Sequence, residues 1–258
     1  MRPIWTGAIG FGLVNIPVKL FSATKDSELN LDMLDKKDLS NIRYMRVNEK
    51  TGKEVNWENI VKGYKVNDRY VVLTDKDFES ANAIKTKIIS IEDFVNATEI
   101  DSVYFETPYY LAPDKSGEKA YSLLHEALQK TGKVGVATFV MRSKESLAVL
   151  RPSNNIILLN RLRFAEEIRD TSEIEPPRSS TVKPGELKMA ISLINQLSHR
   201  FNIKEYKDTY TAQLLKIIKA KAKGKVTKEP QLKVVHNSTK DLMSQLKASL
   251  SPKRKKVS

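Results

Sequence analysis

The sequence contains no cysteine and only three histidines among its 258 residues. Without cysteine there is no disulfide framework, no thiolate nucleophile and no cysteine-based zinc site. The three scattered histidines suggest no Ser-His-Asp arrangement, and His125-Glu126 lacks the second histidine of a HExxH zinc motif. We therefore expect no catalytic residue, no metal and no cofactor. The absence of disulfides fits a reducing cytosol.

Long apolar runs are also missing. No segment approaches the roughly 18 consecutive apolar residues of a membrane-spanning helix. The first 17 residues contain an apolar stretch with glycines but no continuous hydrophobic run and no small-residue cleavage site, so they predict strands and turns rather than a signal peptide. The glycines Gly7, Gly10 and Gly12 do not have the spacing of a dinucleotide-binding GxGxxG motif. We expect a cytoplasmic protein without a membrane partner.

Acidic residues are scarce in only one part of the chain. Residues 216–258 hold 13 lysines and arginines against Glu229 and Asp241, a net charge of +11 within a total of +13. Residues 1–215 hold 31 basic and 29 acidic residues, and are therefore nearly neutral. A basic tail favours a polyanion, because each neutralised phosphate releases condensed counterions. Duplex nucleic acid is the leading partner. An acidic membrane surface, an acidic protein and a merely solubilising tail remain alternatives.

Residues 1 to about 165 read mostly as short strands separated by turns. The dipeptide Asn67-Asp68 between two apolar segments indicates a hairpin, and residues 134–141, 145–151 and 156–162 indicate three further strands. Residues 117–130 have helical periodicity and end before Gly132. After a connector at residues 173–185, two amphipathic helices follow at about 187–201 and 206–218. The pattern predicts a mixed β with α protein, an antiparallel barrel or sandwich with helical additions.

Two pairs of carboxylates are the candidates for an enzymatic alternative. Asp75 with Asp77, or Glu166 with Glu167, could hold a metal for a nuclease or another phosphoryl-transfer enzyme. Asp75 and Asp77 also fall in the first turn of a predicted helix after Thr74, where acidic side chains favour the helix dipole. We favour the structural interpretation.

Several sequence blocks resemble the bacterial Ku proteins of non-homologous end joining. The N-terminal block is RPIWTGAIGFGLVNIPVKLFSAT, and IVKGYKVNDRYVVLTDKDFE follows. Next come KIISIEDFVNATEIDSVYFETPYYLAPD, AYSLLHEAL, VGVATFVMRSKESLAVLRP, LRFAEEIRD and KEYKDTY, in family order. The resemblance covers residues 1 to about 224.

This resemblance implies an antiparallel Ku-type β-barrel core, in which two copies form a homodimeric ring around a central channel. We expect a β-barrel core at residues 1–172, a helical arm at 173–224 and a lysine-rich, largely disordered tail at 225–258. The family implies a non-enzymatic protein, associated with the nucleoid, that threads onto double-stranded DNA ends without sequence preference. It also implies recruitment or stimulation of a multifunctional ATP-dependent bacterial end-joining DNA ligase. The alternative is a general DNA-packaging protein that binds duplex through its tail.

The basic residues at strand ends are the candidates for phosphate contacts, although each alone could equally be a solvated strand end. Alternation along residues 155–164 places Arg161 and Arg163 on one face. Further basic residues occupy the turn before the strand at 145–151 and the end of that strand. The proposed DNA-binding residues are Lys19, Arg142, Lys144, Arg151, Arg161 and Arg163, with Lys253, Arg254, Lys255 and Lys256 in the tail.

Each of the two C-terminal helices has a single apolar face, which needs a partner surface from the barrel or from a second subunit. The proposed dimer-interface residues are Leu187, Ile191, Ile194, Tyr206, Tyr210 and Leu214.

Overall fold

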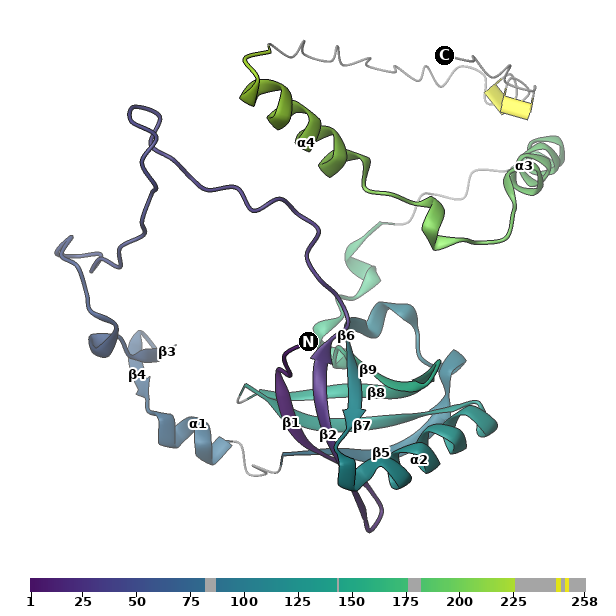
Figure 1. Cartoon of the computed structure of the whole chain (residues 1–258), viewed down its shortest axis with the longest axis horizontal. Coiled ribbons are helices and arrows are strands. Elements are labelled where there is room, and N and C mark those ends of the chain that lie inside the picture. Colours follow the sequence, from purple (N-terminus) through teal and green to yellow (C-terminus); the bar gives the residue numbers. More distant parts are fainter. Residues whose placement is uncertain (82–86, 143, 176–181, 226–244, 247–248, 251–258) are drawn as a thin grey trace. The chain divides into compact units, whose positions relative to one another are not determined.

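The computed structural model describes residues 1–81, 87–142, 144–175, 182–225, 245–246 and 249–250 (Figure 1). The chain divides into two compact units. The first comprises Met1–Asp26 and Asn30–Asp170, and the second begins at Thr171 and includes Ser27–Leu29. Among the residues described, no helix is both long and apolar enough to cross a membrane.

Seven strands of the first unit close into a barrel in the order β1-β2-β6-β9-β8-β7-β5 (Figure 1). Neighbouring strands are antiparallel except at the closure, where β1 and β5 pair in parallel from Ala8↔Ile88 to Gly10↔Ser90. The barrel prediction is confirmed, and the one parallel pair is a correction to the expected antiparallel pattern. The strands are β1 (Trp5–Phe11), β2 (Val14–Ser22), β5 (Ile88–Asn96), β6 (Phe105–Pro113), β7 (Lys133–Met141), β8 (Lys144–Ser153) and β9 (Ile156–Leu162).

The barrel interior is an apolar core built by strand alternation. Alternate residues of each strand face inward, and the inward side chains of Ile9, Val18, Leu111, Leu150 and Leu159 are fully buried. A smaller cluster of Val134, Val149 and Leu162 forms a second core group.

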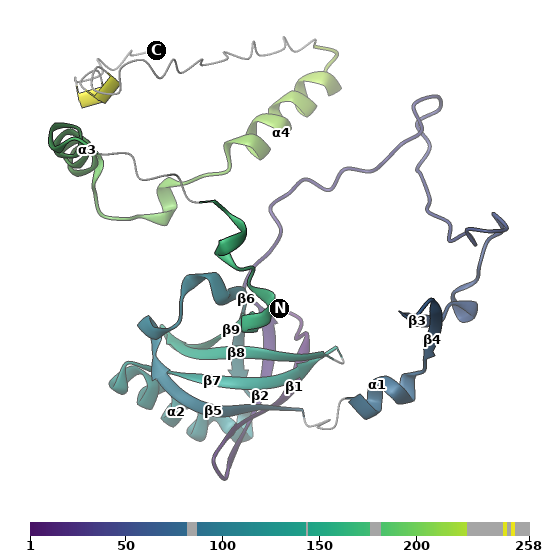
Figure 2. The same ribbon diagram turned by 180° about the vertical axis from the view of Figure 1, so that it is seen from behind.

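Helix α2 (Glu118–Thr131) packs across one end of this core, where β6 ends and β9 begins (Figure 2). The Tyr121 hydroxyl lies inside the core, where it donates to the carbonyl oxygen of Leu111 and accepts from the backbone N–H of Ile157 at 2.6 Å. The helix ends before Gly132, whose φ of 67° is a left-handed conformation that glycine adopts without steric cost. The predicted helix and its stop are confirmed.

The described part of the segment between β2 and β5 adds no strand to the barrel. It contains the hairpin of β3 (Lys62–Val66) and β4 (Arg69–Leu73), joined by Asn67 and Asp68 with φ of 44° and 65°. Both positive angles are those of a type I′ turn, as the sequence predicted. Helix α1 (Asp75–Ala81) follows.

The second unit contains α3 (Pro184–Leu197) and α4 (Thr209–Ala222), which confirms the two predicted C-terminal helices. Asp208 caps α4 by accepting from the backbone N–H of Thr211 at 3.0 Å. Single 3₁₀ turns link the elements of both units, at Trp57–Asn59, Ala97–Glu99, Ser102–Tyr104, Lys115–Gly117, Ala165–Glu167, Thr171–Glu173 and Ile203–Glu205.

Candidate nucleic-acid interface

The end of the barrel opposite α2 carries a cavity of about 250 Å³, which we call the barrel mouth. It lies where β7 and β9 end and β8 begins. Four lining residues are uncharged and three are cationic: Ile4, Tyr109, Met141 and Ser146 with Arg142, Lys144 and Arg161. The barrel therefore brings together three of the cations that the sequence singled out.

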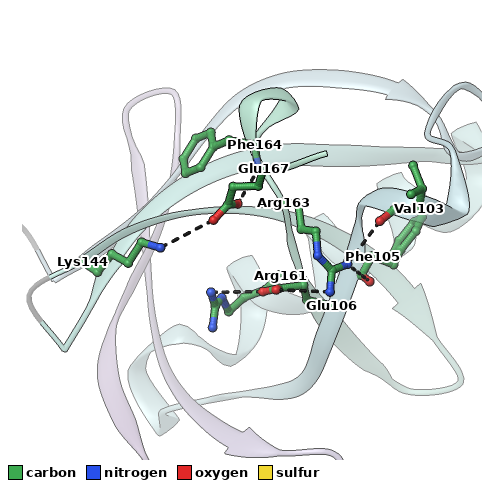
Figure 3. Close-up of polar contacts among 8 residues, drawn as sticks. All are labelled: Val103, Phe105, Glu106, Lys144, Arg161, Arg163, Phe164 and Glu167. Carbon is green, nitrogen blue, oxygen red and sulfur yellow. Dashed lines mark hydrogen bonds and ion pairs between the residues drawn. The ribbon is translucent and has the colours of Figure 1, made fainter. Parts of the chain in front are cut away.

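Arg161 reaches the barrel mouth because it follows the inward-facing Leu159 at a spacing of two on β9. Its Nη2 lies 3.1 Å from Oε2 of Glu106, and both side chains are 26% exposed (Figure 3). Its Nε is buried and has no hydrogen-bond partner in the described part of the chain. Arg161 is thus a partly desolvated cation with one donor unused.

Arg163 is tied into the protein more fully than Arg161. Its Nη1 donates to the carbonyl oxygens of Val103 and Phe105 at 3.2 and 3.0 Å, and its Nη2 lies 3.4 Å from Oε1 of Glu106 (Figure 3). These contacts fix the end of β9 against the start of β6. Its guanidinium consequently has less capacity left for a phosphate.

Lys144 begins β8 and lies 3.6 Å from Oε1 of Glu167 (Figure 3). The pKa of the Glu167 carboxyl is lowered, chiefly because the backbone N–H of Phe164 donates to it at 2.8 Å, with smaller effects from the charges of Lys144 and Arg161. Both side chains are well exposed, so solvent screens this pair. Lys144 remains able to exchange its partner for a phosphate.

Arg142 occupies the two-residue connection between β7 and β8, which the pairing of Met141 with Lys144 defines. Its φ of 54° is one that a tight hairpin connection requires. Its side chain is exposed, and no carboxylate of the described residues lies within ion-pair distance. It is the least committed cation of the barrel mouth.

The other two barrel candidates lie on the outer wall. Lys19 of β2 is ion-paired with Asp114, and its side chain is 42% exposed. Arg151 of β8 donates from Nε to the side-chain oxygen of Asn160 at 3.0 Å. Neither lines the barrel mouth. The four tail candidates Lys253, Arg254, Lys255 and Lys256 fall outside the described residues.

The proposed dimer-interface residues are nearly all uncovered within the second unit. Leu214 is half-buried. The other five, Leu187, Ile191, Ile194, Tyr206 and Tyr210, are 48–73% exposed.

Sequence reasoning missed a second set of uncovered apolar side chains, in the segment between β2 and β5. Tyr44, Trp57, Tyr64 and Tyr70 are all at least 69% exposed, and many aliphatic residues of the segment are exposed as well. The turn dipeptide Asn67-Asp68 between two apolar segments indicated the strands β3 and β4 but not whether another surface would cover them. The long stretch of sequence between the barrel strands β2 and β5 was a signal that could have indicated these uncovered side chains.

Two of the four carboxylates considered for an enzymatic site, Asp77 and Glu167, have structural roles. Asp77 accepts hydrogen bonds from the backbone N–H and the hydroxyl of Thr74 at 2.8 and 2.7 Å. These bonds, with the side-chain hydroxyl contributing most, lower the pKa of Asp77. Over the described ranges, no three His, Asp or Glu residues are grouped so that they could hold a metal.

Residues 10–189 match the family model of the Ku70/Ku80 beta-barrel domain. The chain is similar to the "Non-homologous end joining protein Ku" of Coxiella burnetii, with 42% identity over 98% of this chain and 96% of that protein. The protein of the same name from Bacillus subtilis is 40% identical over 99% of this chain and 83% of that protein. The one from Archaeoglobus fulgidus is 39% identical over 97% and 98%, respectively. This chain belongs to the Ku family, because it matches the family's barrel-domain model, contains the sequence blocks in family order and is similar to these relatives along nearly its whole length.

Proposed function

We propose that this protein is a non-enzymatic, homodimeric protein that binds double-stranded DNA ends without sequence preference and acts in double-strand break repair by end joining. The observation that carries the proposal is its similarity, at about 40% identity and along almost the full chain, to proteins named for non-homologous end joining. Supporting features lie in the charge distribution and in the uncovered apolar surfaces.

The charge distribution suits contact with sugar-phosphate backbone. Arg142, Lys144 and Arg161 gather at the barrel mouth, and the tail carries most of the net charge. Lysine and arginine contacts to phosphates give affinity without sequence information. Such a protein needs no base-reading element, and its affinity should depend strongly on salt.

The uncovered apolar side chains support a second copy as the partner. Residues 31–72 and helices α3 and α4 expose many large apolar side chains, more than a soluble single subunit usually leaves in water. Pairing of two identical chains would bury them in a symmetric interface. We propose that both regions contribute to it and that the paired chains enclose a DNA channel.

Ligase recruitment is the remaining part of the proposal. It rests on the family resemblance, which implies a multifunctional ATP-dependent end-joining ligase. Pull-down of purified ligase by DNA-loaded protein tests it, and ligation that is equally fast with and without the protein would contradict it.

End dependence is tested by competition between linear and covalently closed circular DNA of the same sequence. A ring that must be threaded binds the linear form and ignores the closed circle. The same comparison with residues 225–258 removed separates this proposal from DNA packaging through the tail. We expect the shortened chain to bind more weakly yet keep its preference for linear DNA. Equal binding of both forms by the full chain would favour packaging.

A further inference from the structure

The barrel mouth has the size and charge of a small-anion site. Its volume of about 250 Å³ suits one small group, and it is concave, as ligand sites generally are. Among the described residues that line it, three are cationic and none is acidic; Glu106 and Glu167 pair with Arg161 and Lys144 from outside the lining. A concave surface lined by cations concentrates counterions of the opposite sign.

Two hydroxyl groups in the wall of this cavity have no hydrogen-bond partner among the residues that the structure describes. Tyr109 of β6 and Ser146 of β8 are only 8% and 5% exposed. Tyr109 belongs to the interior core, and Ser146 alternates with the inward-facing Ala148 and Leu150. Within the described ranges neither hydroxyl makes a hydrogen bond, and neither oxygen is among the fully buried unpaired atoms, so both can be reached from the cavity. Each can donate to an anion oxygen.

The cations of the barrel mouth also retain unused donors. Within the described part of the chain, Arg161 leaves its buried Nε unpaired, and Lys144 has one exposed carboxylate at 3.6 Å as its ion-pair partner. Arg142 has no acidic partner in the described chain. The arrangement thus offers charged donors and neutral donors around one cavity.

We propose that the barrel mouth binds a single phosphate group, held by Arg142, Lys144 and Arg161 and by the hydroxyls of Tyr109 and Ser146. Guanidinium groups present paired N–H donors that match phosphate oxygens, and the hydroxyls complete the donor set from the barrel interior. The assignment of this phosphate to DNA rests on the proposed function. The phosphate belongs to DNA, either at a strand terminus or within the backbone.

Calorimetric titration of the full chain with inorganic phosphate, against sodium chloride of equal ionic strength, tests the cavity directly. The double variant Tyr109→Phe/Ser146→Ala removes two oxygen atoms and should bind phosphate about tenfold more weakly. Arg142→Gln, at an exposed position, should weaken binding to a similar extent. Tyr110→Phe is the matched control, because the neighbouring residue of β6 does not line this cavity, and it should bind as the original chain does. Phosphate binding no stronger than the chloride effect, or unchanged in both cavity variants, would overturn the proposal.

Short duplexes with 5′-phosphate or 5′-hydroxyl ends identify the source of the phosphate. A preference for the phosphorylated end that disappears in Tyr109→Phe/Ser146→Ala assigns the cavity to a terminal phosphate. Equal weakening of both duplexes in that variant assigns it to a backbone phosphate. If inorganic phosphate binds as expected while no duplex does, the cavity assignment stands and the proposed DNA function fails.

Discussion

Arg161 and Glu106 form a partly buried ion pair of 3.1 Å at the wall of the barrel mouth. The carboxylate also lies 3.4 Å from Arg163, so one acidic residue of β6 holds Arg161 of β9 and Arg163, the residue that directly follows β9. The pairing between β6 and β9 is irregular between Phe105 and Pro108, and Glu106 lies within this irregular stretch. The pair therefore links the local geometry of the barrel to the charge of the candidate interface.

Replacing Glu106 by glutamine should lower the free energy of unfolding by about 1–2 kcal/mol, between the values typical of exposed and of buried ion pairs. Urea denaturation measures the change. Glu126→Gln is the control, because the Glu126–Lys130 pair of α2 is 65–80% exposed and contributes little. Equal stability of the two variants would contradict the structural importance of the Glu106 cluster.

Charge reversal at the barrel mouth should weaken DNA binding more than an equal reversal elsewhere. We expect Arg142→Glu/Lys144→Glu to lower duplex affinity and to flatten its log–log salt dependence by about 0.9 for each phosphate that the variant no longer neutralises. The control Lys130→Glu/Lys133→Glu makes the same change in net charge near α2, at the other end of the barrel. If both double variants bind duplex with the same reduced affinity, net charge rather than the barrel mouth determines binding.

The Tyr121 hydroxyl should be an important stabilising group of the barrel. Tyr121→Phe leaves the buried N–H of Ile157 without its 2.6 Å partner, and this should cost about 2–3 kcal/mol of unfolding free energy. Tyr110→Phe on β6 removes a hydroxyl that makes no hydrogen bond among the described residues, and should change stability little. Comparison of the denaturation midpoints of the two variants tests this prediction. A negligible effect of Tyr121→Phe would contradict the assigned hydrogen bonds.

The N-terminal end of α4 should lose protection in acid. The pKa of Asp208 is lowered from 3.8 by hydrogen bonds from the Thr211 hydroxyl and then from its backbone N–H, so the ionised carboxylate favours the folded helix. This contribution is fully present above the unfolded-state pKa and is lost as the pH falls through the lowered one. Amide exchange at residues 209–212 should accelerate over that window. The Asp208→Asn variant caps the helix without titrating, so its amide exchange should lack this acceleration in acid. Equal acid sensitivity of exchange in both proteins would refute the prediction.

Local elements could be predicted where one residue type dictates the conformation. Asn67-Asp68 specified a tight hairpin turn, and Gly132 specified the end of α2. Alternation identified β7, β8 and β9, whose short connections also fix their antiparallel order. The parallel closure of β1 with β5 was not predictable, because these strands are separated by a long segment whose described residues add no barrel strand.

The candidate site could be predicted only in part, for a similar reason. The spacing of Arg161 from Leu159 showed which face of β9 it would occupy. The pairing of Lys19 with Asp114 depends on the contact between β2 and β6, which residue spacing does not encode. Likewise, Tyr109 and Ser146 looked like ordinary strand residues until the barrel placed them around one cavity.

Retention on DNA with blocked ends tests the ring most directly. The protein is loaded onto linear duplex, both ends are closed with bulky blocks, and the complex is washed at about 1 M salt, where charge contacts are screened beyond about 3 Å. A threaded homodimer stays on the blocked DNA and leaves when a nuclease cuts it. Equal loss from blocked and open DNA in the high-salt wash would contradict an enclosing ring.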